Sequence, residues 1–141
     1  METNSAKLDR SKEFRAVFEI SGSLACDRTE YDAVINAAVS SSTFLEGISK
    51  LRSGGVFCLF SGLTSRDLIP SSLINEVHYR QLHVVGAYGC TRDNMEKALV
   101  LLQHHPEDIE WLVQDKIRLE QVPDVLPAVL CGEVLRFIIE L

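Results

Sequence analysis

Histidine is the residue type in this sequence that most invites a metal-site interpretation. His78 and His83 have no cysteine or carboxylate at a metal-site spacing near them, apart from Glu76. His104 and His105 are adjacent near the end of a predicted helix, where an imidazolium interacts favourably with the helix dipole. We therefore interpret the histidines as solvated or capping side chains and predict no metal site in this chain.

Ser61 and the tyrosines are the other candidates for catalysis. Ser61 follows an apolar run, as a hydrolase nucleophile would, but Leu59 and Leu63 stand where flanking glycines are needed. Neither Tyr79 nor Tyr88 has a lysine four residues later, so the short-chain dehydrogenase pair is missing. The G-x-G-x-x-G turn, the Walker A loop, the H-E-x-x-H motif and the EF-hand loop are also missing. The sequence therefore predicts no catalytic residue.

Small residues follow three apolar runs, and they are the best candidates for binding. These are Ala37-Ala38, Ser61-Gly62 and Gly86-Ala87. In open parallel sheets, ligands bind outside the carboxyl ends of the strands. Small residues there let the backbone approach a flat ring closely, although they also simply permit tight turns.

The elements that position these residues follow from apolar periodicity. Ala33–Val39 is nearly continuously apolar, as in a parallel strand covered on both faces. Thr43 and Glu46 have the spacing of a capping box, which predicts a helix start. The glycine pair 54–55 is expected to end that helix, and Val56–Phe60 is expected to form the next strand.

Further elements alternate along the rest of the chain. We expect a short helix after Pro70, a strand over Leu82–Tyr88, a helix over 92–105 capped by Thr91, a helix within 120–131 and a strand over Val134–Leu141. Residues 14–20 fit either a short helix or a strand. The alternation predicts the α/β class, with the first two strands parallel and joined by a right-handed crossover.

Composition excludes several kinds of partner. The formal net charge of the 141 residues is -6, whereas nucleic acids and anionic membranes require a concentrated basic face. The apolar runs are far too short to span a membrane, and the amino-terminal residues have no apolar segment typical of a secretory signal. The four cysteines are far apart and form no C-x-x-C pair. That spacing favours a reducing, cytoplasmic setting over a disulfide framework.

Longer stretches of the sequence resemble one enzyme family. Asp32–Leu63, DAVINAAVSSSTFLEGISKLRSGGVFCLFSGL, resembles the segment of medium-chain zinc-type alcohol dehydrogenases that runs "D-v-v-i-e-a-v-G … l-r-p-G-G-r-v-v-l-v-G". The stretch INEVHYRQLHVVGAYGCTRDNMEKALVLL is similar to the family's "h-Y-r-E-l-x-i-x-G-s-y-g" strand and the helix after it. The ending GEVLRFIIEL is similar to "G-x-x-l-K-v-v-i". Together these stretches resemble the C-terminal part of the cofactor-binding domain, in the threonine and polyol dehydrogenase branch.

The resemblance implies a partial Rossmann-like fold, a mostly parallel sheet with flanking helices. Residues 1–30 would be a leader and added edge element, and residues 31–141 the C-terminal part of a dinucleotide-binding domain. In the family, backbone groups at three strand ends hold the nicotinamide side of NAD or NADP, and a basic residue of the closing strand reaches the pyrophosphate in some members. The matching positions are Ala37, Val39, Ser61, Gly62, Ala87, Gly89 and, for the basic residue, Arg136.

Departures from the family pattern weaken the expected activity. Val39 stands where the family usually has glycine. The zinc-binding catalytic domain, the glycine-rich turn and the acidic residue for the ribose have no counterpart here. Because that turn and the helix behind it supply most of a pyrophosphate site, we expect weak NAD or NADP binding and no turnover by this chain alone.

A sheet cut in this way leaves unpaired strand edges, which seek partners. We expect residues 1–30 to rebuild an edge, with Phe14–Ile20 as strand or covering helix, or else pairing with a second copy or a complementary dehydrogenase chain. Two functions follow from this. The chain is either part of a nicotinamide-dependent alcohol or polyol dehydrogenase, or a non-catalytic oligomerisation or interaction module descended from that family. The substrate and the choice between NAD and NADP stay open.

Overall fold

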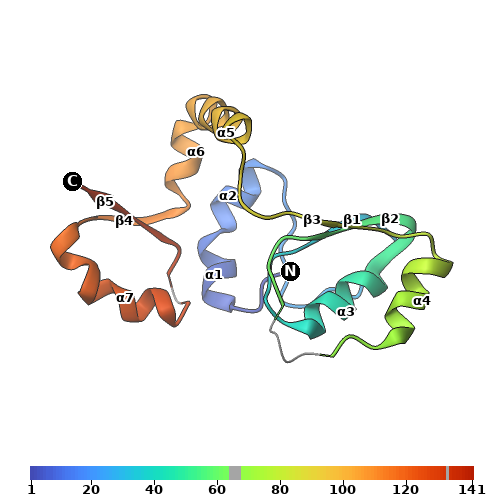
Figure 1. Cartoon of the computed structure of the whole chain (residues 1–141). Coiled ribbons are helices and arrows are strands. Elements are labelled where there is room, and N and C mark those ends of the chain that lie inside the picture. The colour runs from blue at the N-terminus through green and yellow to red at the C-terminus, as the bar shows by residue number, and fades with distance from the viewer. Residues whose placement is uncertain (64–67, 133) are drawn as a thin grey trace. The chain divides into compact units, whose positions relative to one another are not determined.

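The computed structural model describes residues 1–63, 68–132 and 134–141, with the backbone alone at 108–109 (Figure 1). These residues form two compact units. Asp27–Cys90 is called the sheet unit below, and residues Met1–Cys26 with Thr91–Leu141 are called the terminal unit. No helix of the described residues is both long and apolar enough to cross a membrane.

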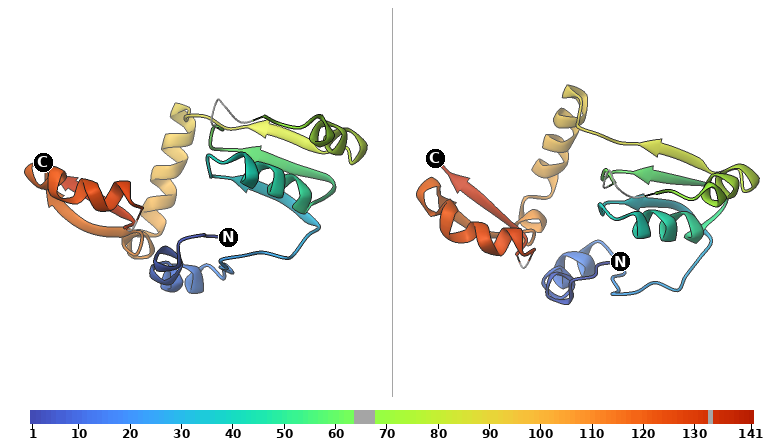
Figure 2. Two further views of the ribbon diagram at one scale, coloured as in Figure 1. Left: turned by 90° about the horizontal axis from the view of Figure 1, so that it is seen from below. Right: turned by 60° about the horizontal axis from the view of Figure 1, so that its bottom comes forward.

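The sheet unit alternates strands and helices, as the sequence predicts. Its elements are β1 (Tyr31–Asn36), α3 (Ser41–Lys50), β2 (Leu51–Leu59), α4 (Ser71–Tyr79) and β3 (His83–Gly86). The strands pair in the order β1-β2-β3, and both pairings are parallel (Figure 2). The predicted α/β class with a mostly parallel sheet is therefore confirmed. Between β2 and α4, residues 64–67 lie outside the described residues.

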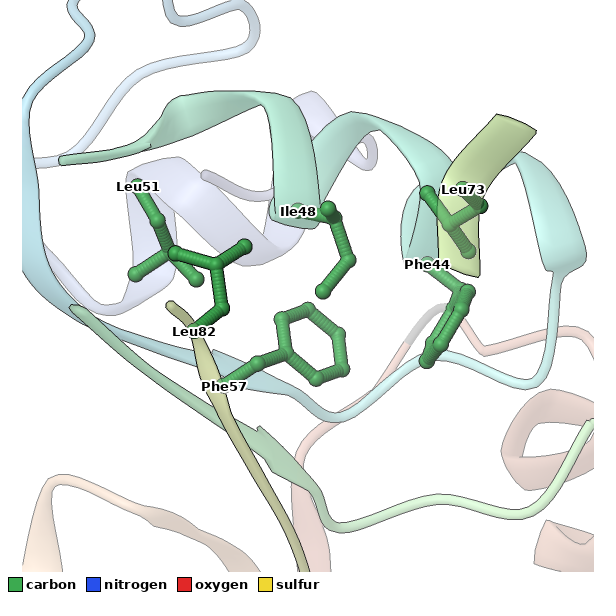
Figure 3. Close-up of a cluster of buried hydrophobic side chains, with 6 residues drawn as sticks. All are labelled: Phe44, Ile48, Leu51, Phe57, Leu73 and Leu82. Carbon is green, nitrogen blue, oxygen red and sulfur yellow. The ribbon is translucent and has the colours of Figure 1, made fainter. Parts of the chain in front are cut away.

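One face of this sheet carries the core. Helices α3 and α4 lie on the same side of the sheet (Figure 1). Six buried apolar side chains pack between the helices and the sheet (Figure 3); they are Phe44, Ile48, Leu51, Phe57, Leu73 and Leu82. The rings of Phe44 and Phe57 meet edge to face with centroids 4.9 Å apart, a favourable aromatic geometry. This core fixes the directions in which the strands end.

The opposite face of the sheet remains open. Ile35, Cys58 and Val85 are neighbours across the three strands. Ile35 is 68% exposed and Val85 is 45% exposed, and Cys58 is half-buried. In an α/β sheet both faces are normally covered, whereas the described helices of the sheet unit, α3 and α4, lie on one face only (Figure 1).

Two local predictions about α3 are wrong. Ser40, and not Thr43, is the N-cap, and its hydroxyl accepts a hydrogen bond from the Ser42 amide. The helix ends at Lys50, before the glycine pair 54–55, which lies inside β2. The pairing of β1 with β2 shifts in register across this glycine pair, and Gly54 has a φ of +74° that favours glycine. The glycines therefore form an irregularity of the strand.

The terminal unit contains the remaining elements. They are α1 (Ser5–Arg10), α2 (Lys12–Val17), α5 (Arg92–His104), α6 (Pro106–Glu110), β4 (Val113–Arg118), a 3-10 turn (Leu119–Gln121), α7 (Val122–Leu130) and β5 (Arg136–Glu140). The Thr91 cap of α5 and the helix within 120–131 are confirmed. Strand β4, which pairs in parallel with β5, is absent from the sequence prediction. Of the two expectations for residues 14–20, the helix is observed through Val17, and among the described residues this segment adds no strand to the sheet of β1, β2 and β3.

Candidate functional site

The carboxyl ends of the three parallel strands lie side by side at one end of the sheet. Asn36, Leu59 and Gly86 are register partners and the last residues of β1, β2 and β3. The loops that begin after them therefore start side by side. We call this place the strand-end site, comprising residues 37–40, 60–63 and 87–90.

Six of the seven sequence-predicted site residues lie in these loops. They are Ala37, Val39, Ser61, Gly62, Ala87 and Gly89. The seventh, Arg136, belongs to the terminal unit, where it is the first residue of β5, pairs opposite Val113 and has an exposed side chain. Six of the predicted residues thus lie together in the sheet unit, and Arg136 lies in the terminal unit.

Backbone hydrogen bonds connect the loops to the neighbouring strands. The amides of Phe60 and Ser61 both donate to the carbonyl oxygen of Asn36, at 3.1 and 3.0 Å. The amide of Ala87 donates to the carbonyl oxygen of Leu59 at 3.0 Å. The loops after β2 and β3 therefore begin with their backbone hydrogen-bonded to the neighbouring strand of the sheet.

The strand-end site has room for a ligand close to the backbone. A Cβ atom added to Gly62, Gly86 or Gly89 would meet no heavy atom of the described residues within 4 Å, apart from its own chain neighbours. The side chain of Val39 is 62% exposed, and Ser61 and Ala87 are half-buried. Gly89 has a φ of +67°, a conformation that side chains disfavour. A flat ring with polar edges can thus approach peptide groups here.

Asn36 is the residue at this site that the sequence analysis misses. It is 5% exposed, and its Oδ1 accepts hydrogen bonds from the Ala38 amide at 3.3 Å and the Thr43 hydroxyl at 3.1 Å. Its Nδ2 has no partner among the described residues. The signal for it was an asparagine within the apolar run AVINAAV, where a buried amide needs hydrogen-bond partners.

The charged contacts of the sheet unit lie at the amino ends of its strands. Arg52 Nε donates to Asp32 Oδ1 at 2.6 Å, and this hydrogen bond together with the guanidinium charge lowers the pKa of Asp32 below its ordinary value of 3.8. Arg80 donates to the carbonyl oxygens of Ile48, at 3.2 Å, and of Leu51. These charges stabilise the start of the sheet and lie at the other end of the strands from the candidate loops.

The remaining candidate metal and ligand sites have less support. Among the described residues, no group of three or more histidine, cysteine, aspartate or glutamate side chains could hold a metal ion. A hollow of about 350 Å³ opens along α5, lined by Asp93, Glu96, Lys97 and Val100. All four residues come from one side of a single exposed helix, so the hollow is a gap between surface side chains.

Comparison with known proteins gives matches at the level of structure. No family model matches the chain, and no curated protein matches it. An alcohol dehydrogenase from Thermotoga maritima superposes with a TM-score of 0.70 and 18% identity, over 96% of this chain and 35% of the other. The L-idonate 5-dehydrogenase of Escherichia coli gives 0.69 and 11% identity, over 82% and 33%. Haloferax mediterranei glucose dehydrogenase, in complex with NADP, Zn and gluconolactone, gives 0.67 and 16% identity, over 79% and 32%.

These matches concern the fold, because the identities are low. They also show that the chain spans about a third of the length of each of these dehydrogenases. The predicted partial Rossmann-like fold and the resemblance to zinc-type medium-chain dehydrogenases are confirmed at this level. The chain has the fold of about one third of a zinc-type alcohol or polyol dehydrogenase.

Proposed function

We propose that the chain supplies part of the cofactor cleft of a nicotinamide-dependent alcohol or polyol dehydrogenase, an oxidoreductase, and does not turn over alone. One observation carries the proposal: three parallel strands end in register, each is followed by small residues, and the glycines at the ends of β2 and β3 have open space around them. Ligands of open parallel sheets bind at this edge. The similarity to dehydrogenases, one of them in complex with NADP, supports the choice of ligand.

The backbone at the strand-end site would hold the nicotinamide end of NAD or NADP. Peptide groups of Ala37, Val39, Ser61, Gly62, Ala87 and Gly89 would contact the ring and its carboxamide. Arg136 belongs to the terminal unit, so its contact with the pyrophosphate stays a prediction from the family resemblance and is no part of the strand-end site. When bound, the cofactor supplies hydride transfer. The chain's own part is to orient the ring and to keep water from its covered face.

Residues outside the strand-end site would have to supply the rest of the catalytic and pyrophosphate-binding machinery. The described side chains do not fit a zinc ion, so we derive no step that uses one. The sequence contains no glycine-rich turn to receive the pyrophosphate. Binding by this chain alone should therefore be weak, with a Kd on the order of millimolar. A complementary dehydrogenase chain is the partner that this function requires.

A non-catalytic interaction module is the second candidate. Val39 places a branched side chain at the position where a ring would approach, and the open face around Ile35 and Val85 favours a partner surface. In that case the partner is a second copy or another chain. For both candidates we propose a cytoplasmic location without nucleic-acid or membrane partners. Cys58, Cys90 and Cys131 are free thiols, in agreement with a reducing setting.

A matched pair of variants tests the proposed cleft. Val39→Gly removes the branched side chain, whereas Gly62→Val adds one where space is open. In calorimetric titrations with NADH and NADPH, Val39→Gly should tighten binding and Gly62→Val should weaken it, each roughly tenfold, the equivalent of about 1.4 kcal/mol.

Stability serves as the control for this pair. Val39 is exposed and Gly62 has open space, so each variant should change the free energy of unfolding by no more than about 1 kcal/mol. Equal affinities in wild type and both variants would exclude cofactor contact at these loops and favour the interaction module.

A further inference from the structure

Asn36 is the residue where the first two loops of the strand-end site meet. Its carbonyl oxygen accepts both the Phe60 and the Ser61 amides, which begin the loop after β2. Its Oδ1 accepts the Ala38 amide and the Thr43 hydroxyl, which belong to the loop after β1 and to the first turn of α3. The Thr43 hydroxyl has one hydrogen and also lies 2.7 Å from the Ser40 carbonyl oxygen, so Asn36 Oδ1 shares that donor, whereas the Ala38 amide has Oδ1 as its acceptor.

These hydrogen bonds are shielded from water. Asn36 is 5% exposed, so a lost partner would leave a buried amide with unsatisfied groups. The side-chain bond to the Ala38 amide spans two residues and has the pattern of an Asx turn, a local substitute for a backbone turn. The bond to Thr43 attaches the same amide to α3, so the loop is held between the strand and the helix.

The bond to Ala38 also orients the peptide group before it. In a trans peptide, the N–H and the preceding C=O point in opposite directions. The Ala38 N–H points toward the buried Asn36 side chain, so the carbonyl of Ala37 points away from it. Ala37 is exposed, and an outward carbonyl there can accept a hydrogen bond from a ligand amide or hydroxyl group.

We infer that Asn36 is a positioning residue for the nicotinamide cofactor: its Oδ1 holds the 37–40 loop so that the Ala37 carbonyl faces the ligand. The inference rests on the proposed function for the identity of that ligand. The acceptor oxygen does the positioning, while Nδ2 has no partner among the described residues. An aspartate can therefore replace Asn36, because it presents acceptor oxygens to the same two donors near a helix N-terminus. A leucine cannot.

The experiment compares Asn36→Leu, Asn36→Asp and the control Asn75→Leu, which removes an exposed asparagine from α4. Amide exchange is measured in the full chain without cofactor, and NADH is then titrated. In Asn36→Leu, the Ala38 amide should exchange roughly tenfold faster and the Kd for NADH should rise roughly tenfold, since a lost buried hydrogen bond costs about 1 kcal/mol or more. Asn36→Asp should restore both, and Asn75→Leu should change neither.

The two readouts separate the inference from the proposed function. Unchanged Ala38 exchange in Asn36→Leu overturns the positioning role, whatever NADH does. Faster Ala38 exchange with unchanged NADH affinity overturns it as well, because the loop would then be irrelevant to the ligand. If wild type binds no NADH, the proposed function fails, and with it the cofactor role of Asn36. Ala38 exchange then decides only whether the amide organises the loop.

A second variant covers the case in which Asn36→Leu does not fold, which loss of protection at the Phe57 amide in β2 would reveal. Thr43→Val removes the hydroxyl that Asn36 Oδ1 shares with the Ser40 carbonyl oxygen and keeps the shape of the side chain. It should speed Ala38 exchange severalfold and weaken NADH binding in parallel. Unaltered exchange and affinity in Thr43→Val would overturn the inference.

Discussion

At the scale of single residues, the two ends of the sheet are held by different chemistry. The carboxyl ends are connected by neutral hydrogen bonds to Asn36, whereas the amino ends are connected by charged groups. Arg80 donates to the carbonyl oxygens of Ile48 and Leu51, and its own carbonyl accepts the Gly54 amide at 2.8 Å. The charged contacts of Arg52 and Arg80 thus lie at the opposite end of the strands from the strand-end site.

The ion pair of Asp32 with Arg52 makes a prediction about pH. The pKa of Asp32 is lowered, so the contribution of the pair to stability is present above the ordinary value of 3.8 and is lost as pH falls through the lowered value. Arg52→Met should raise the pKa of Asp32 toward 3.8, because it removes both the hydrogen bond and the positive charge. NMR titration of the Asp32 carboxyl carbon measures this directly.

The matched control for that titration is Arg92→Met. It removes an arginine whose partner is Glu96, an i,i+4 neighbour on α5. The Asp32 titration curve should stay the same in this variant. An Asp32 pKa that is unmoved by Arg52→Met, or moved equally by both variants, would contradict the role given to Arg52.

The candidate residues differ in how far the sequence could predict them. Small residues such as Gly62 stand out because they interrupt apolar runs, and their order along the chain matches a family pattern. Asn36 and Arg80 could not be found in this way. Asn36 has partners close by in the chain, but only the fold shows that its side chain is buried. The partners of Arg80, Ile48 and Leu51, lie far along the chain, and only the fold brings them together.

At the scale of elements, one glycine decides how closely α3 packs on β2. A Cβ added at Gly47 would lie 2.6 Å from Cε2 of Phe57, whose side chain is fully buried, and 3.2 Å from a methyl group of Val34. The ring of Phe57 is itself fixed against Phe44. The helix therefore approaches the sheet at a distance that only glycine allows.

Gly47→Ala should consequently destabilise the chain, although alanine is the better helix former. Overpacking typically lowers the free energy of unfolding by about 1–3 kcal/mol. This loss outweighs the gain in helix propensity, which is about 1 kcal/mol at most. We expect a net loss on the order of 1–2 kcal/mol in urea unfolding. Gly62→Ala is the control, because its Cβ meets open space and should leave the midpoint nearly unchanged. A stabilised Gly47→Ala variant would contradict the packing described here.

The elements themselves were predictable to the extent that periodicity was clear. The three strands of the sheet unit and helix α5 have continuous apolar runs or a regular apolar stripe, and all were expected. Strand β4 was missed because its sequence, VQDKIR, is mostly polar, and only Ile117 within it is buried. The start of α3 was misplaced because two hydroxyl residues, Ser40 and Thr43, both matched a cap, and only the geometry distinguishes them.

At the scale of the whole molecule, the described helices of the sheet unit, α3 and α4, lie on one face of its sheet (Figure 1). Among the described residues, no strand pairs with the outer edge of β1 or of β3. The row of Ile35, Cys58 and Val85 adds an apolar surface. Unpaired edges and exposed apolar faces are the features through which chains associate. The chain also spans only about a third of the dehydrogenases with its fold.

We therefore predict that the purified chain self-associates at micromolar concentration. Sedimentation velocity should show a weight-average mass above 15.8 kDa that rises with concentration. Ile35→Lys places a charge on the open face and should shift the distribution toward monomer. The control Ile74→Lys changes an exposed isoleucine on α4 and should leave the association unchanged. A strictly monomeric wild type across the micromolar range would contradict this prediction.

The most direct test of the proposed cleft is a titration of the labelled chain with NADH and NADPH, followed by amide chemical shifts. The account predicts saturable shifts at millimolar cofactor, confined to residues 37–40, 61–63 and 86–89 in the sheet unit. Shifts scattered over both units, or none at all at these concentrations, would contradict a surviving half of the cofactor site and would leave the interaction module as the function of this chain.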